Sequence, residues 1–323
     1  MSNTKVVNQV GSQDLSPELS VPDRRKFIKG AGLLFGAGAV SALATPAMAA
    51  LATPAMGAPV TSNLPSANAT GSYNSVLDKV LATKEISFGV DLGFAPLQYK
   101  KADGTPTGYI VDLANKLAAS LGATPKWVEI PFGDLFAGQA AGKFDMSGIA
   151  ATIKPERAQK VLFSGAPAFV ESNVVLFKPG YKVSKLSALN SSSVTIAVVL
   201  GSSQESAAQL LYPKAKLKRL SNQAALADVS AGRSHAMIVG EFSVAEAIKS
   251  NSKLTVFKGK PVFVDENSFF MPAGDIAMKN YVDTWLRYET SHNTLAGLWD
   301  KYVGNSARKL GLQSVSVTSA WSA

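Results

Sequence analysis

The sequence predicts an α/β protein whose sheets are mostly parallel, and three observations point to this class. Short apolar strands alternate with amphipathic helices from residue 86 onward. The same order occurs in two separate stretches, 86–151 and 194–239. Three of the predicted helices stop at a glycine, which tolerates the left-handed backbone that ends many helices. Regular alternation of this kind favours parallel strands joined by helical crossovers.

The first stretch begins with a strand at 86–90 that ends at Asp91. A helix after Gly108 places Ile110, Leu113, Ala114, Leu117 and Leu121 on one face and ends at Gly122. A strand at 127–130, a helix at 132–141 ended by Gly142, and a strand at 144–151 follow. This order predicts one βαβαβ unit.

The second stretch has the same organisation. It comprises a buried strand at 194–200, a helix starting with hydroxyl caps at 201–205, a weaker strand at 216–220, a helix at 223–231 and a strand at 235–239. Periodic apolar residues then predict one long helix over 279–303. Residues 313–323 are polar and without periodicity, which is typical of a tail.

Residues 152–157 lie where the strand at 144–151 ends. Pro155 is suited to the first turn of a helix because its φ is fixed. Thr152 adds a hydroxyl, and Arg157 adds a planar fork that matches a carboxylate. Ligands of open α/β sheets bind at the carboxyl ends of strands, so this segment is a candidate binding site. A surface arginine paired with a nearby acid is the alternative.

Residues 1–57 are interpreted as an export signal with a duplicated cleavage region. Arg24 and Arg25 precede an uncharged stretch rich in Ala, Gly and Leu, and LATPAM occurs at both 43–48 and 51–56. The paired arginines resemble a twin-arginine signal, although Asp23 stands where Ser or Thr is usual. Residues 58–73, rich in Pro, Ser, Asn and Ala, are expected to form a flexible lead-in.

Composition excludes several functions. The chain has no cysteine, which rules out disulfides, thiolate metal sites, a cysteine nucleophile and a lipid-modified cysteine anchor. The net charge falls from +9 to +7 on removal of residues 1–49, which carry five basic and three acidic side chains. Scattered Lys and Arg do not favour nucleic acid. No metal or cofactor is expected, and an exported protein of this kind is expected in the periplasm or secreted.

Taken together, these elements resemble the extracellular solute-binding proteins of polar-amino-acid ABC transporters. The likeness extends over residues 85–304. It rests on the motif DLGFAPL at 91–97, the Gly-aromatic-x-x-Asp-Leu helix at 108–121, the helix–turn–strand segment at 132–145, TIKPER at 152–157 with Phe-Ser at 163–164, GSSQE at 201–205, and LWDKYVG at 298–304.

The resemblance implies a periplasmic-binding-protein fold with two α/β lobes joined by two hinge strands. The first lobe would comprise 74–168 and 269–306, the second 169–268, and a tail would cover 307–323. A monomer without enzymatic activity would capture an amino acid or related carboxylate between the lobes and deliver it to a membrane permease. A sensor or chemoreceptor would be an alternative partner.

Ligand-binding positions that the resemblance implies are Asp91, Phe94, Phe132, Ala150, Thr152, Arg157, Ser203, Gly240 and Glu241. Arg157, Thr152 and Ser203 would hold the ligand carboxylate, and the two phenylalanines would enclose its side chain. Each of these assignments has a structural alternative. Ser203 could simply cap a helix, the phenylalanines could pack in a core, and Asp91 could cap a turn.

Three departures from the family pattern concern the ligand. Gly240 stands where the family has the Asp that holds the α-ammonium, and Glu241 follows it. Either the acid has moved by one residue or the ligand lacks an α-amino group. Lys154 replaces a Thr, and His235 replaces an acid. A second function is a periplasmic cyclohexadienyl dehydratase-like enzyme, with Glu171 or Glu241 as the proton donor.

Overall fold

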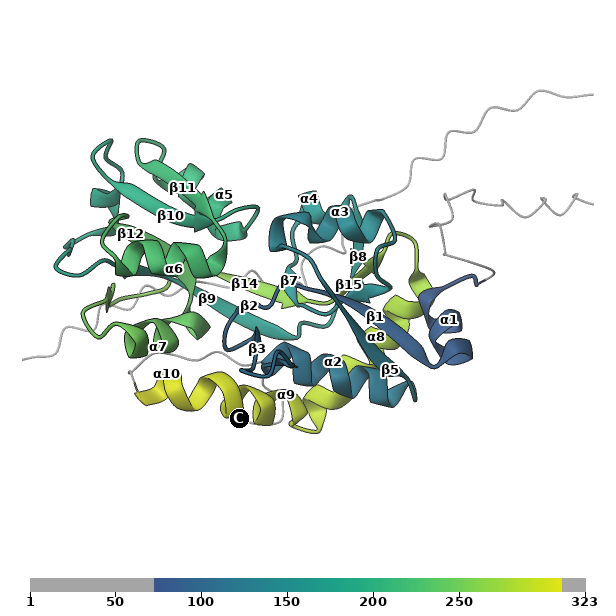
Figure 1. Cartoon of the computed structure of the whole chain (residues 1–323). Coiled ribbons are helices and arrows are strands. Elements are labelled where there is room, and N and C mark those ends of the chain that lie inside the picture. The colour runs from purple at the N-terminus through teal and green to yellow at the C-terminus, as the bar shows by residue number, and fades with distance from the viewer. Residues whose placement is uncertain (1–72, 310–323) are drawn as a thin grey trace, which may run out of the picture. The chain divides into compact units, whose positions relative to one another are not determined.

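The structure, a computed structural model, describes residues 73–309 of the 323-residue chain (Figure 1). The predicted export signal, nearly all of the lead-in at 58–73 and most of the predicted tail therefore lie outside the described residues. No helix within 73–309 has both the length and the apolar character needed to cross a membrane.

The first lobe is built on a parallel three-stranded sheet of order β5 (Thr124–Glu129), β1 (Glu85–Val90) and β6 (Met146–Ser147). Phe88 of the central strand pairs with Trp127 on one side and Met146 on the other. Helices α1 (Val76–Thr83), α2 (Tyr109–Ser120) and α3 (Leu135–Ala140), with the 3-10 helix η2 (Phe132–Asp134), accompany this sheet. Strands β2 (Gly93–Phe94), β3 (Gln98–Lys100) and β4 (Pro106–Thr107) form a small antiparallel sheet beside it.

The second lobe contains parallel strands β11 (Lys216–Leu220), β10 (Thr195–Val199) and β12 (Ala236–Gly240). The same sheet continues through antiparallel β9 (Phe169–Phe177), β14 (Phe263–Ser268) and β7 (Ala151–Thr152), with β13 (Thr255–Val256) at its side. Helices α5 (Ser203–Leu211), α6 (Asn222–Ser230) and α7 (Glu241–Ser250) and the 3-10 helix η3 (Leu186–Leu189) complete this part.

Strands β9 and β14 run side by side between the two lobes (Figure 1). The chain leaves the first lobe along one and returns along the other, so the two are antiparallel. This explains why the larger sheet is mixed, whereas the sequence predicted mostly parallel sheets. The returning chain forms β15 (Phe270–Pro272), which pairs with β8 (Val161–Phe163).

The long helix predicted for 279–303 is divided in the structure. It forms α8 (Ile276–Ser291), α9 (Thr294–Trp299), the π-helix η4 (Asp300–Gly304) and α10 (Asn305–Lys309). The division falls at Asn293, whose φ of 59° is left-handed and cannot continue a helix. Apolar residues of α8, α9 and η4 join the core that contains Tyr109 and Phe169. Helix α10 includes 307–309, which the sequence placed in the tail, and Ala307 is buried.

Helix α4 (Pro155–Ala158) begins at Pro155, which confirms the prediction that this residue opens a helix. The strand predicted for 144–151 is wrong in its extent, because only the short strands β6 and β7 lie there, separated by residues 148–150. Elements for which local sequence patterns gave no prediction include α1, α7, β8, β9 and β14.

Candidate functional site

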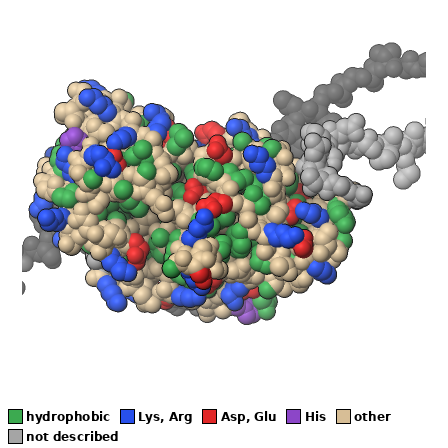
Figure 2. Space-filling view, viewed as in Figure 1, with side chains coloured by type: hydrophobic (Ala, Val, Ile, Leu, Met, Phe, Trp, Pro, Cys, Tyr) green, Lys and Arg blue, Asp and Glu red, His purple; other side chains and the backbone are tan. Residues whose placement is uncertain are grey.

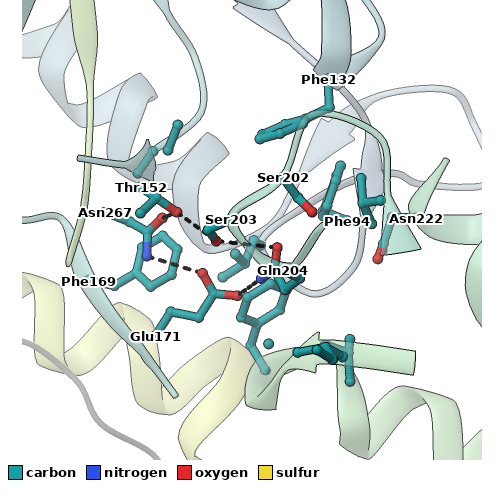
Figure 3. Close-up of a pocket in the computed structure, with 18 of the residues that line it drawn as sticks. Phe94, Phe132, Thr152, Phe169, Glu171, Ser202, Ser203, Gln204, Asn222 and Asn267 are labelled. Carbon is teal, nitrogen blue, oxygen red and sulfur yellow. Dashed lines mark hydrogen bonds between the residues drawn. The ribbon is translucent and has the colours of Figure 1, made fainter. Parts of the chain in front are cut away.

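A cavity of about 50 Å³ lies where the first lobe, the second lobe and the connecting strands meet (Figure 3). Its volume is enough for a few water molecules, so a larger ligand requires its walls to move apart. The cavity is lined by Phe94, Leu97, Gln98, Phe132, Ala150, Ala151, Thr152, Arg157, Phe169, Glu171, Val199, Ser202, Ser203, Gln204, Asn222, Met237, Ile238, Val239, Gly240, Phe242 and Asn267. Seven of the nine predicted site residues therefore lie together.

Arg157 is the positive group of the cavity and is only 5% exposed. Its Nη1 donates to the Thr152 carbonyl at 2.9 Å and its Nη2 to the Gly201 carbonyl at 3.0 Å. The guanidinium carbon lies 4.8 Å from the centre of the Phe136 ring. Burial lowers the pKa of Arg157 to about 10, so the group stays charged at neutral pH. Of the five N–H donors of an arginine, three remain for a ligand.

Two hydroxyls lie on either side of the cleft beside this arginine. Thr152 Oγ1 of β7 is 3.3 Å from Ser203 Oγ at the start of α5. Ser202, rather than Ser203, caps the helix, because its side chain accepts from the Glu205 N–H at 3.0 Å. The Ser203 hydroxyl is therefore not used for capping. Both hydroxyls and the arginine can donate hydrogen bonds to one anion.

The predicted aromatic walls also line the cavity. Phe94 on β2 and Phe132 on η2 are half-buried, with ring centres 5.5 Å apart. Ala150 lines it just before β7. Asp91 does not line it: its carboxylate accepts from the N–H groups of Gly93 and Phe132, both at 2.8 Å. Burial raises the pKa of Asp91, and these two bonds oppose that shift. Asp91 thus caps a turn and positions the two aromatic walls.

Glu171 of β9 is a carboxyl group that the sequence considered only for an enzyme. It lines the cavity and is 6% exposed. Gln204 Nε2 donates to its Oε1 at 2.9 Å, and Asn267 Nδ2 to its Oε2 at 3.2 Å (Figure 3). Burial, and then the nearby Asp265, raise the pKa of Glu171 to about 8, against the effect of these hydrogen bonds and of Arg157. A neutral acid is therefore expected at pH 7.

Gly240 lines the cavity at the end of β12, but Glu241 does not. Glu241 begins α7, is 7% exposed, and lies in a separate small cavity with Trp299, Val303 and Ala307. Burial raises its pKa to about 7, and a hydrogen bond with Ser172 opposes the shift. The structure therefore does not bring Glu241 to the predicted site.

Further hydrogen bonds join the two lobes around the cavity. Asn222 Nδ2 of α6 donates to the Gly93 carbonyl at 3.0 Å, and Lys154 Nζ lies 3.3 Å from Ser206 Oγ. Burial, and then Arg157, lower the pKa of Lys154. Together with the Arg157–Gly201 contact, these bonds hold the lobes closed over the cavity.

The sequence did not identify Gln98, Glu171, Asn267 or Phe242 as ligand-binding positions. One signal was present: residues 171–173, Glu-Ser-Asn, interrupt an otherwise apolar buried strand. His235 lies outside the cavity, and its Nδ1 accepts from the Thr195 N–H at 3.0 Å. In residues 73–309 no group of three or more His, Asp or Glu side chains could hold a metal ion. Lys and Arg are dispersed among acidic and apolar groups on the face in Figure 2.

Two lobes, two connecting strands and a cavity between them with polar and apolar walls define the class of periplasmic solute-binding folds. The chain belongs to the bacterial extracellular solute-binding proteins, family 3, whose sequence profile matches residues 86–305. A solved structure of an ancestral amino acid-binding protein, a precursor of cyclohexadienyl dehydratase, is similar with a TM-score of 0.66 and 30% identity. The match covers 71% of this chain and 100% of that one.

Curated relatives fall into several functional classes. Cyclohexadienyl dehydratase of Pseudomonas aeruginosa is 26% identical over 66% of this chain and 80% of its own length. The histidine-binding periplasmic protein of Salmonella typhimurium is 25% identical over 64% and 78%. Membrane-bound lytic murein transglycosylase F of Maricaulis maris is 38% identical over 104 residues, which are 32% of this chain. The match spans only 22% of the transglycosylase.

Proposed function

We propose that this protein binds an amino acid, or a related small molecule with a carboxylate, and delivers it to the permease of an ABC importer. The observation that carries the proposal is the convergence of Arg157, Thr152 and Ser203 on one cavity. A buried guanidinium and two hydroxyls are strong donors for a carboxylate. The family and the amino acid-binding relatives support this choice of ligand.

The arginine is arranged for binding before the ligand arrives. Its contacts with the Thr152 carbonyl and the Phe136 ring fix the guanidinium plane, which reduces the entropy lost on binding. Its contact with the Gly201 carbonyl comes from the opposite lobe. Opening the lobes breaks that contact and exposes the donors. Closure over a bound carboxylate then shields the ion pair from water.

The same proposal includes the protein's location and state. It acts in the periplasm as a monomer without catalytic activity, and the twin-arginine-type segment at 24–25 directs its export. The absence of cysteine from the sequence supports a form without a lipid anchor. The proposed division into lobes at 74–168, 169–268 and 269–306 places the hinges where β9 begins and β14 ends.

Isothermal titration with the twenty L-amino acids tests the binding function. We expect at least one to bind with micromolar or better affinity. Arg157→Ala should weaken it by about 100-fold or more, since a buried carboxylate loses its charged partner. Arg157→Lys should bind with intermediate affinity, because it keeps the charge but loses the planar fork.

Arg287→Ala, an exposed arginine on α8, is the matched control and should leave the affinity unchanged. Circular dichroism establishes that each variant is folded. Failure of all twenty amino acids, and of their 2-hydroxy acid analogues in the same titration, to bind would contradict the proposed function. Equal affinity of folded wild type and Arg157→Ala would contradict the role of Arg157.

One observation favours a second function. Glu171 projects into the cavity with a pKa raised to about 8, as a general acid requires. A dehydratase would use this proton on the leaving hydroxyl of prephenate or arogenate, which departs as water while the ring carboxylate leaves as carbon dioxide. Assays for phenylpyruvate and phenylalanine decide the matter. Turnover that Glu171→Gln abolishes would establish the enzyme, and its absence would leave binding as the function.

A further inference from the structure

The carboxyl group of Glu171 fills the space that a side chain at residue 240 would occupy. A Cβ atom added at Gly240 would lie 2.3 Å from Glu171 Oε1 and 2.2 Å from Phe242 Cε1. Both distances are far below van der Waals contact, so a side chain at residue 240 would require Glu171 and Phe242 to move from their present positions. The Glu171 carboxyl reaches this point from β9, the antiparallel neighbour of β12, where Gly240 pairs with Asn173. An acid is therefore present at this end of the cavity, supplied by a different strand.

A second acceptor lies in the same cavity. Gln98 of β3 is 4% exposed, and its Oε1 has no hydrogen-bond partner among the described residues. A buried acceptor left unpaired costs stability, so such an atom in a binding cavity indicates a donor on the ligand. A carboxylate carries no such donor, whereas an ammonium group carries three.

We propose that Glu171 binds the α-ammonium of the ligand, so that the cavity selects zwitterionic amino acids over carboxylates that lack an amino group. This inference rests on the proposed binding function and specifies its ligand. Arg157, Thr152 and Ser203 take the carboxylate, and Glu171 with Gln98 takes the ammonium. Neither a shift of the acid to Glu241 nor a ligand without an amino group is then needed to explain Gly240.

The charges around Glu171 make its binding of a cation proton-linked. Two charged groups act on the Glu171 carboxyl: Arg157 of α4 is a cation that lowers its pKa, and Asp265 of β14 is an acid that raises it. Glu241 of α7 lies with it along a neighbouring small cavity. Because burial raises the pKa of Glu171 to about 8, we expect Glu171 to hold a proton in the unliganded protein at pH 7. An ammonium placed beside it favours the carboxylate, so binding should release that proton to solvent.

Matched ligands test the inference directly. The probes are L-alanine, L-leucine and L-phenylalanine, each compared with its 2-hydroxy acid: L-lactate, L-2-hydroxyisocaproate and L-phenyllactate. The remaining seventeen amino acids complete the titration. Wild type should bind the amino acid of a pair about tenfold or more tightly than the hydroxy acid, since a hydrogen bond to a charged group is lost.

Glu171→Gln keeps the shape and removes the charge. It should weaken amino-acid binding by about tenfold or more and change hydroxy-acid binding by less than about threefold. Glu171→Asp, which keeps the charge one methylene farther away, should bind amino acids better than Glu171→Gln does. Glu266→Gln on β14, an exposed acid, is the matched control. Titration at pH 7 in two buffers of different ionisation enthalpy should show proton release for wild type and none for Glu171→Gln.

The outcomes separate the two proposals. Binding of hydroxy acids as tightly as amino acids, or equal losses for both in Glu171→Gln, would overturn the role of Glu171 and leave the binding function intact. Retained proton release in folded Glu171→Gln would also overturn it. Absence of binding by all twenty amino acids and by the hydroxy acids would instead overturn the proposed function, and this inference with it.

Discussion

Two buried ionisable groups, Arg157 and Glu171, determine which ligand charges the cavity can accept. Arg157 and Glu171 are both nearly inaccessible, yet each has several hydrogen-bond partners that offset the cost of burial. Asn267 connects the two halves, because its Oδ1 lies 3.2 Å from Thr152 Oγ1 and its Nδ2 donates to Glu171. We therefore expect a ligand held by Thr152 to affect the hydrogen bonds of Glu171.

Glu171 should make stability depend on pH. The folded protein keeps its proton up to about pH 8, whereas a glutamate of ordinary pKa 4.5 loses it far earlier. The free energy of unfolding should therefore fall as pH rises through this interval, by at most about 1.4 kcal/mol per pH unit for this one group. Burial also raises the pKa of Glu241 to about 7. Glu241 therefore contributes to the fall in unfolding free energy only below about pH 7.

Urea unfolding between pH 5 and 8 measures this dependence. Glu171→Gln should remove the fall between pH 7 and 8, where Glu241 no longer contributes, and Glu266→Gln should retain it. An unchanged slope in Glu171→Gln would mean that Glu171 is already ionised in the folded protein.

A side chain at residue 240 should lower stability. Gly240→Ala places a methyl group against the Phe242 ring and the Glu171 carboxyl, which should cost about 1–3 kcal/mol of unfolding free energy. Gly165→Ala is the control, because its nearest neighbours beyond the adjacent residues lie 3.7 Å from the added atom. Chemical denaturation compares the two. Equal stability of both variants would show that Glu171 and Phe242 move aside readily.

At the scale of elements, helix ends position the site. Helix α5 is capped by Ser202, which leaves Ser203 facing Thr152. Helix α4 begins at Pro155 without a side-chain cap, and its short length brings Arg157 back toward the Thr152 carbonyl. The cleft residues thus depend on the first turns of two helices from opposite lobes.

A glycine inside α9 provides an independent check of the C-terminal helices. Gly297 lies in the interior of this helix, and nothing lies within 4 Å of an added Cβ. Gly297→Ala should therefore raise the free energy of unfolding by about 0.5–1 kcal/mol, since glycine loses more backbone entropy in a helix. Thermal denaturation followed by circular dichroism measures it. A loss of stability would contradict the packing described for α9.

Local periodicity could predict the elements that alternate regularly, and α2 and β11 are confirmed closely. It could not predict β9 and β14, because polar residues interrupt the apolar residues of both strands without a regular period. The long C-terminal helix was predicted as one element because its apolar spacing continues past Asn293. Its division depends on the backbone of that single residue.

Two of the three donors proposed for the carboxylate, Thr152 and Arg157, come from one continuous segment, so the sequence could place them together at the cavity. The group proposed for the ammonium could not be found in this way, since Glu171 and Gly240 are distant in sequence. Their relation arises only from the pairing of β9 with β12. Predictions made from residue 240 alone therefore pointed to Glu241, whose side chain lines a neighbouring small cavity instead.

At the scale of the whole molecule, ligand binding and lobe closure should be one process. Contacts such as Arg157–Gly201 and Asn222–Gly93 cross between the lobes, so separation of the lobes would break them. A ligand that binds only the folded protein stabilises it by about 2.7 kcal/mol at one hundred times its dissociation constant. Urea unfolding with and without the tightest-binding amino acid measures this gain. No gain at that concentration would contradict binding to the folded state.

The most direct measurement is a crystal structure of the protein with the tightest-binding L-amino acid. We predict its carboxylate within about 3.2 Å of the Arg157 guanidinium and of the Thr152 or Ser203 hydroxyl, at ordinary hydrogen-bond distance. Its ammonium should lie at the same distance from Glu171. An amino acid bound elsewhere, or bound in this cavity without contact to Arg157, would contradict the account.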